Sequence, residues 1–193
     1  NGYLLIEDFG DTCFKKIMDG ADKSKAAYVL AARVLERLSV QDCPLDLPNY
    51  YDSHVHKRHR RVVDWYIPLA NGQRNEDGMV EGYRAVWQEI EQSLPPQPQS
   101  FLHVDFHAEN LMWLPGEKGL KRCGIIDFQG AMIGPAPYDL ANLLEDARHD
   151  VPDNIRARIL SRFDGETLAW YRILATQFHC RVIGQFIKQA AID

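Results

Sequence analysis

The sequence predicts an α+β fold that is mostly helical and carries one small β-hairpin. Apolar residues recur at helical spacing in three long stretches, 23–40, 79–94 and 165–192. In the middle of the chain, two short apolar runs at 111–114 and 123–126 are joined by a turn that begins with Pro-Gly, which is the pattern of a hairpin. A chain of 193 residues that is 46% hydrophobic and 25% charged is typical of a globular domain.

The order of the elements follows from apolar periodicity and from the prolines that interrupt it. In chain order we expect a strand over 3–11, helices over 23–40, 52–66 and 79–94, a strand at Phe101, the hairpin, and helices over 138–148, 153–163 and 165–192. Proline-containing loops separate these elements at 42–49 and 95–98. Asp139 stands near the start of one helix, where we expect it to brace the loop before the hairpin.

Charge and composition exclude several classes of partner. A net charge of −5 gives no basic footprint for nucleic acid. No apolar run is long enough to cross a membrane, so we expect no membrane partner. The four cysteines are widely scattered and form no C-x-x-C pair, which favours reduced thiols in the cytoplasm over disulfides or zinc.

The chemistry-bearing residues gather around the hairpin. His103, Asp105, His107 and Asn110 come directly before its first strand, and Asp127 comes directly after its second. A hairpin brings Asn110 and Asp127 together at its open end. Phosphoryl transfer needs a base for a hydroxyl proton and oxygen ligands for Mg²⁺. His103, Asp105 and Asn110 have the H-x-D-x-x-x-x-N spacing of a catalytic loop for phosphoryl transfer. Asp127, in Asp-Phe-Gln, stands where the metal-binding aspartate of Asp-Phe-Gly would be.

These motifs resemble the catalytic signature of the aminoglycoside phosphotransferase family, kinase-like enzymes that act on small molecules. The segments DFHAENLMWLPG, GIIDFQGAMIGPAPYDLANLLEDAR and DWYIP are similar to those of one branch, the bacterial anomeric kinases of N-acetylmuramate and N-acetylglucosamine. The resemblance implies a protein-kinase-like C-terminal lobe that uses ATP and Mg²⁺. It further implies a small-molecule hydroxyl as acceptor, with the anomeric hydroxyl of these sugars, in cell-wall recycling, as the best candidate.

The family pattern assigns a role to each of the central residues. Asp105 is implied to be the catalytic base, His103 to brace the catalytic loop beside it, and Asn110 and Asp127 to bind Mg²⁺. Val104 and Gln129 stand where protein kinases have Arg and Gly. These two differences argue against a protein kinase that is regulated through its activation loop.

The resemblance also gives the first residues a role. The phrase LLIEDFGD matches the hinge of such kinases, with Ile6 as gatekeeper and with the Glu7 carbonyl and the Phe9 amide facing adenine. Residues 1–11 are therefore expected to be the hinge from a missing N-lobe, and residues 12–193 a C-terminal lobe that is incomplete at both ends. A fragment of this kind is expected to be inactive alone.

Other interpretations stay open. An aminoglycoside or choline kinase of the same family, or a non-catalytic pseudokinase fragment, has the same motifs. His103, Asp105 and His107 would share one face of an extended segment, which is compatible with a metal-dependent hydrolase. Asp64 and Trp65 are candidate substrate contacts, because a carboxylate beside an aromatic ring suits a sugar. The basic stretch 54–61 would contact a phosphate or a lactyl carboxylate, or form a solvated helix face, which we favour.

Overall fold

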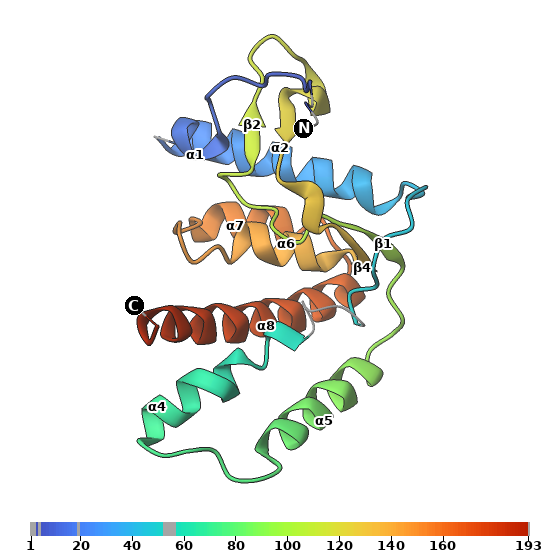
Figure 1. Cartoon of the computed structure of the whole chain (residues 1–193). Helices are drawn as coiled ribbons and strands as arrows, with labels where there is room; N and C mark the ends of the chain where they lie inside the picture. Colours follow the sequence, from blue (N-terminus) through green and yellow to red (C-terminus); the bar gives the residue numbers. More distant parts are fainter. Residues whose placement is uncertain (1–2, 4, 19, 52–56, 193) are drawn as a thin grey trace.

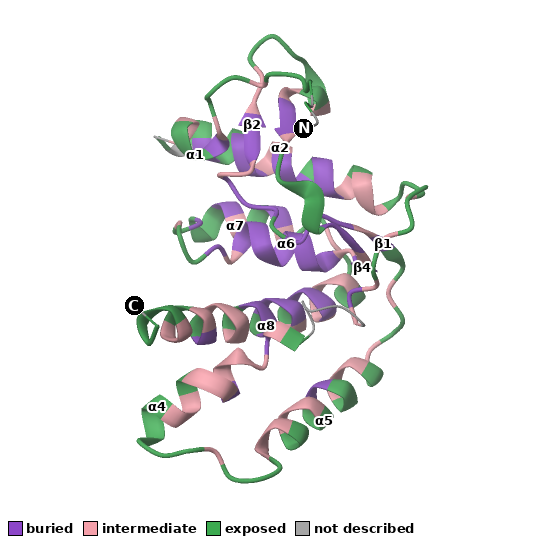
Figure 2. Cartoon of the chain, viewed as in Figure 1, coloured by how far each residue is buried: buried purple, intermediate pink, exposed green. Residues whose placement is uncertain are grey.

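The computed structural model describes residue 3 and the ranges 5–18, 20–51 and 57–192. Its centre is a stack of three helices, α2 (Ala21–Ser39), α6 (Pro137–Leu144) and α8 (Gly165–Ala190) (Figure 1). Every residue of α6 is buried, whereas α2 and α8 bury the faces that they turn toward it (Figure 2). Helix α6 is therefore the middle of the core, and it carries the side chains that fix the loop described below.

Two small antiparallel sheets lie beside this stack. Strand β1 (Gln99–Leu102) pairs with β4 (Met132–Pro135). Strand β2 (Leu111–Trp113) pairs with β3 (Cys123–Ile125) through a connection that contains the 3₁₀ turn η2 (Gly119–Arg122), so the predicted hairpin is confirmed. Its register sets Leu111 opposite Ile125, which brings the next residues, Asn110 and Ile126, together at the open end.

The remaining elements are short or lie at the edges of the stack. They are α1 (Phe14–Ile17), the π-helix η1 (Val62–Tyr66), α4 (Ile67–Asn71), α5 (Met79–Gln92), the 3₁₀ turn η3 (Phe128–Gly130) and α7 (Asp153–Leu160). The long predicted helices are confirmed to within a few residues. The helix expected over 138–148 ends at Leu144. Of the helix expected over 52–66, residues 52–56 lie outside the described part, and its last turn is the π-helix.

The prediction of a strand over 3–11 is wrong for the residues that the structure describes. Tyr3, Leu5 and Ile6 are exposed, and no strand within the described chain pairs with them. A strand without a neighbour has no partner for its backbone groups, so this apolar run stays irregular. The backbone is instead tied to the hairpin at Thr12, whose carbonyl oxygen accepts a hydrogen bond from the Trp113 amide at 2.8 Å.

One glycine allows α8 to approach the segment before η1 closely. A Cβ at Gly184 would lie 2.1 Å from the carbonyl carbon of Arg61, a distance that no side chain tolerates. The absence of a side chain thus brings the Arg61 backbone against α8. Among the described helices, none is long and apolar enough to cross a membrane.

Candidate active site

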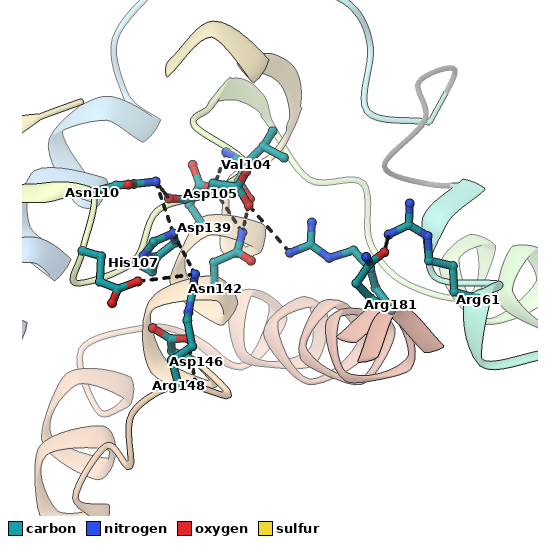
Figure 3. Close-up of polar contacts among 12 residues, drawn as sticks. Arg61, Val104, Asp105, His107, Asn110, Asp139, Asn142, Asp146, Arg148 and Arg181 are labelled. Carbon is teal, nitrogen blue, oxygen red and sulfur yellow. Dashed lines mark hydrogen bonds and ion pairs between the residues drawn. The ribbon is translucent and has the colours of Figure 1, made fainter. Parts of the chain in front are cut away.

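The loop between β1 and β2 is clamped by a buried carboxylate from α6. Asp139, which is 2% exposed, accepts hydrogen bonds from the His103 amide at 2.5 Å and the Val104 amide at 2.9 Å. The Asn142 side chain donates to the Val104 carbonyl at 2.8 Å (Figure 3). Burial raises the pKa of Asp139 to about 6, while both amides favour its ionised form. The expectation that Asp139 braces this loop is confirmed.

Asp105 follows the clamped peptide and reaches outward. Val104 has a φ of 77°, which is rare for a β-branched residue, and the clamp on both sides of its peptide holds it there. The Asp105 side chain is 51% exposed, and its Oδ1 lies 3.8 Å from a terminal nitrogen of Arg181. A carboxylate on a rigid backbone is thus presented to solvent, next to a cation.

Asn110 presents a free oxygen at the open end of the hairpin. Its Nδ2 donates to the Asp105 carbonyl at 3.0 Å, and its own carbonyl accepts from the Ile126 amide at 3.1 Å. Within the described part of the chain, its Oδ1 has no hydrogen-bond partner. Because Nδ2 is held by the Asp105 carbonyl, Oδ1 is left available to a ligand.

Asp127 lies one residue beyond Ile126, at the same end of the hairpin. Its backbone is left-handed, with φ 65° and ψ 38°, a conformation that aspartate tolerates better than most residues. Its exposed carboxylate accepts from Gln129 Nε2 at 2.7 Å. One amide oxygen and one carboxylate at this end are the oxygen ligands that Mg²⁺ prefers, so the residues present fit that ion.

His103 ties the loop to the segment that carries Asp127. Its ring is 1% exposed, and Nε2 lies 2.8 Å from the Ile126 carbonyl, so Nε2 carries the proton and donates. The ring packs edge-on against Phe106, with 5.8 Å between the ring centroids. Its contacts are those of a bracing residue.

His107 supports Asn110 from a buried position. Its Nε2 lies 3.2 Å from Asn110 Nδ2 and 3.1 Å from a terminal nitrogen of Arg148. Both neighbours are donors, so Nε2 accepts and the ring is neutral. Burial, followed by the charge of Arg148, lowers the pKa of His107, which agrees with this assignment. Residue spacing does not predict the contact of Arg148 with His107, because the two residues are 41 positions apart in the sequence.

The geometry of the loop contradicts the alternative of a metal-dependent hydrolase. The segment after β1 is not extended, and the positive φ of Val104 breaks the alternation that would place His103, Asp105 and His107 on one face. Each histidine Nε2 already faces a protein group. In the described residues, no group of three His, Cys, Asp or Glu side chains is arranged to hold a metal ion.

Phe9 of the expected hinge lies against the hairpin. A Cβ at Gly124 would lie 2.7 Å from Cδ2 of Phe9, so the Phe9 ring rests on the glycine of β3. Glu7 is exposed. Neither the Glu7 carbonyl nor the Phe9 amide has a hydrogen-bond partner in the described part of the chain. Their contact with adenine stays a prediction.

An open cleft of about 430 Å³ adjoins Asp105. Its charged lining consists of Arg58, Arg61, Arg148 and Arg181 with Asp105 and Asp146. The solvated-face interpretation of the basic stretch is therefore wrong for Arg58 and Arg61, which are half-buried, although Lys57 is exposed as expected. One side of the cleft is formed by Phe178, Arg181 and Gln185 of α8. Their helical spacing, which places them on one face, was the signal for this side that the sequence contains.

Asp64 and Trp65 do not line this cleft. The Asp64 carboxylate accepts two hydrogen bonds from Arg60, at 2.9 and 2.8 Å. The Lys188 ammonium lies 5.9 Å from the centre of the Trp65 ring. Their contact with a substrate stays a prediction. His54 and His56, at the start of the basic stretch, lie outside the described residues.

Comparison with models of known protein families shows which family the chain belongs to. The model of the phosphotransferase enzyme family matches residues 3–174, which is most of the chain. The chain belongs to this phosphotransferase family. The resemblance that the sequence motifs carry is thus confirmed.

Curated kinases are similar over most or all of the chain. An N-acetylmuramate/N-acetylglucosamine kinase of Caulobacter vibrioides is 27% identical over 209 aligned positions, which cover 100% of this chain and 57% of that protein. An enzyme of the same name from Pseudomonas putida is 30% identical over 152 positions, which cover 76% of this chain and 41% of that protein. The chain spans about half the length of the curated relatives that it matches.

Solved structures of phosphotransferases share the fold. Amicoumacin kinase in complex with AMP-PNP, Ca²⁺ and Ami superposes with a TM-score of 0.59 at 14% identity, covering 86% of this chain and 51% of that one. A GDP complex of a mutant aminoglycoside 2′-phosphotransferase IIIa superposes with a TM-score of 0.57 at 16% identity, covering 92% and 60%. The predicted α+β, kinase-like C-terminal-lobe fold is confirmed.

Proposed function

We propose that the protein transfers the γ-phosphoryl group of ATP to a hydroxyl group of a small molecule. The observation that carries this proposal is the meeting of Asp105, Asn110 and Asp127, joined by the Asn110–Asp105 and Ile126–Asn110 hydrogen bonds at 3.0 and 3.1 Å. Catalysis of phosphoryl transfer consists mainly of positioning and charge neutralisation, and a braced loop of this kind supplies the positioning.

Each residue has one task in this proposal. Asp105 orients the acceptor hydroxyl and accepts its proton, because it is the exposed carboxylate on the clamped loop. Asn110 and Asp127 hold Mg²⁺, which neutralises charge on the nucleotide phosphates when bound. The backbone of Glu7 and Phe9 receives adenine. The AMP-PNP and Ca²⁺ in the amicoumacin kinase complex support the use of a nucleotide and a divalent cation.

For the acceptor we propose the anomeric hydroxyl of N-acetylmuramate or N-acetylglucosamine. The names of the curated relatives support this choice. The charge of the cleft supports it too, since its four arginines outnumber its two carboxylates, and the excess positive charge would repel a cationic aminoglycoside or choline. Such a reaction consumes ATP and sugars released from the cell wall, so we assign it to cell-wall recycling in the cytoplasm.

The test measures ADP release by the full-length protein with ATP, in the presence and absence of Mg²⁺. The acceptor panel holds N-acetylmuramate, N-acetylglucosamine, glucosamine, kanamycin and choline. We expect Mg²⁺-dependent turnover with the two acetylated sugars alone. Phosphorus NMR of the product should show a phosphate at the anomeric carbon.

The other outcomes have distinct meanings. Turnover of kanamycin or choline, with none of the sugars, would preserve the phosphotransferase activity and reject the acceptor. Absence of turnover with every acceptor, together with no ATP binding in calorimetry, would reject the kinase proposal and favour a pseudokinase.

A further inference from the structure

The four arginines beside Asp105 are only partly balanced by carboxylates of the described chain. Arg148 is paired, with its Nε 2.7 Å from Asp146 Oδ1. Arg181 has only the long contact of 3.8 Å with Asp105. Neither Arg58 nor Arg61 forms an ion pair within the described residues. The cleft therefore carries an excess of positive charge next to the proposed base.

This charge is held in place by packing. Arg61 donates to Gln185 Oε1, a neutral group, and the close approach at Gly184 fixes the Arg61 backbone against α8. The Arg181 guanidinium stacks on the Phe178 ring, 5.0 Å from its centroid. Figure 3 shows Arg61 and Arg181 together, on the other side of Asp105 from the hairpin end. Two separate segments thus converge to make one cationic wall.

Keeping these groups close together is unfavourable without a counter-ion. Burial lowers the pKa of Arg58 and of Arg61, and the charge of Arg181 lowers both further. Half-buried cations of this kind gain most from an anion that accepts two parallel hydrogen bonds from a guanidinium, as a carboxylate does. A cleft of about 430 Å³ has the size of a small-molecule site.

We propose that Arg58, Arg61 and Arg181 form a subsite for a carboxylate on the acceptor, and so select acidic over neutral amino sugars. This inference rests on the proposed function. N-acetylmuramate and N-acetylglucosamine provide a matched pair, since the first differs from the second by a lactyl ether that bears a carboxylate. The arginines bind that carboxylate while Asp105 receives the hydroxyl.

The test is the ratio of kcat/KM for N-acetylmuramate to that for N-acetylglucosamine, measured on the full-length protein. Arg61→Gln and Arg58→Gln should each lower this ratio about tenfold to a hundredfold, the effect of losing a charge-assisted hydrogen bond. Arg61→Lys should give an intermediate ratio, because it keeps the charge and loses the paired donors. Circular dichroism and thermal unfolding check that each variant folds.

Arg60→Gln is the control, because it removes the same charge from the same segment. Arg60 pairs with Asp64 and does not line the cleft, so the ratio should stay unchanged. If the wild-type protein turns over both sugars and Arg58→Gln and Arg61→Gln leave the ratio unchanged, the subsite is wrong and the proposed function stands.

A parallel measurement separates the acceptor from the nucleotide. If the arginines contact ATP phosphates instead, Arg58→Gln and Arg61→Gln should lower kcat/KM equally for both sugars and raise the KM for ATP. That result would overturn the subsite. If the wild-type protein phosphorylates neither sugar, the proposed acceptor and the subsite fail together.

Discussion

At the residue scale, the backbone of Val104 determines where Asp105 lies. A positive φ at a β-branched residue costs on the order of 1–3 kcal/mol. The structure offsets this with three hydrogen bonds, two that the Asp139 carboxylate accepts from the loop amides and one that Asn142 donates to the Val104 carbonyl. Strain of this size persists only where the surroundings fix the conformation. The clamp is therefore the device that presents the proposed base.

The clamp gives a prediction about stability. In Asp139→Asn, one of the two backbone amides at His103 and Val104 loses its acceptor, because an amide group offers one oxygen where the carboxylate offers two. We expect a loss of about 1–3 kcal/mol in the free energy of unfolding, measured by urea denaturation. The control, Asp150→Asn, changes an exposed carboxylate and should stay within about 0.5 kcal/mol of wild type. Equal stability of the two variants would contradict the clamp.

Sequence reasoning reached part of this arrangement. The spacing of Asp105 and Asn110, and the hairpin that follows, predicted that Asn110 and Asp127 meet, because strand register is a local property. The contact of Arg148 with His107 was not predicted, since it depends on how α6 and the residues after it pack. Long-range packing has no signature in residue spacing.

At the element scale, the contact between α8 and η1 depends on Gly184. Arg61 and Val62 approach α8 through their backbone, and any Cβ at position 184 overlaps them. This contact carries Arg61 to the wall of the cleft. Sequence periodicity predicted α8, but a glycine inside a helix does not by itself reveal which neighbour it admits.

Two glycines in helices give a matched pair of substitutions with opposite expected signs. Gly184→Ala should lower the free energy of unfolding by about 1–3 kcal/mol, because the new methyl group overlaps backbone atoms. Gly82→Ala, on α5, should raise it by about 0.5–1 kcal/mol, because no atom lies within 4 Å of the new Cβ and alanine is the better helix former. Thermal or urea unfolding measures both. Stabilisation by Gly184→Ala would show that α8 and η1 do not approach as described.

The two failed expectations at this scale have physical causes. The apolar run 3–11 predicted a strand, yet a strand needs a partner, and the described chain provides none there. The basic stretch predicted a solvated face, yet Arg58 and Arg61 line the cleft, and the close approach of α8 at Gly184 brings the Arg61 backbone there. Both outcomes depend on neighbours that are distant in sequence.

At the scale of the whole molecule, the stack of α2, α6 and α8 supports the edge that carries the proposed site. Helix α6 holds the loop that carries Asp105, and the hairpin presents Asn110 and Asp127. Helix α8 and the segment before η1 together supply the cationic wall of the cleft. Nucleotide and acceptor would thus approach Asp105 from opposite sides. The sequence predicted the helical fold and the hairpin edge because apolar periodicity and turn residues encode them directly.

The role of Asp105 as base is tested by the rate of ADP release by Asp105→Asn in the full-length protein, measured beside its affinity for ATP and Mg²⁺. Asparagine keeps the size of the side chain and cannot accept the proton. We predict a fall in kcat of about 10²–10⁴-fold, with unchanged ATP affinity and an unchanged free energy of unfolding. Turnover within a few-fold of wild type, with folding intact, would contradict the assignment of Asp105 as the base.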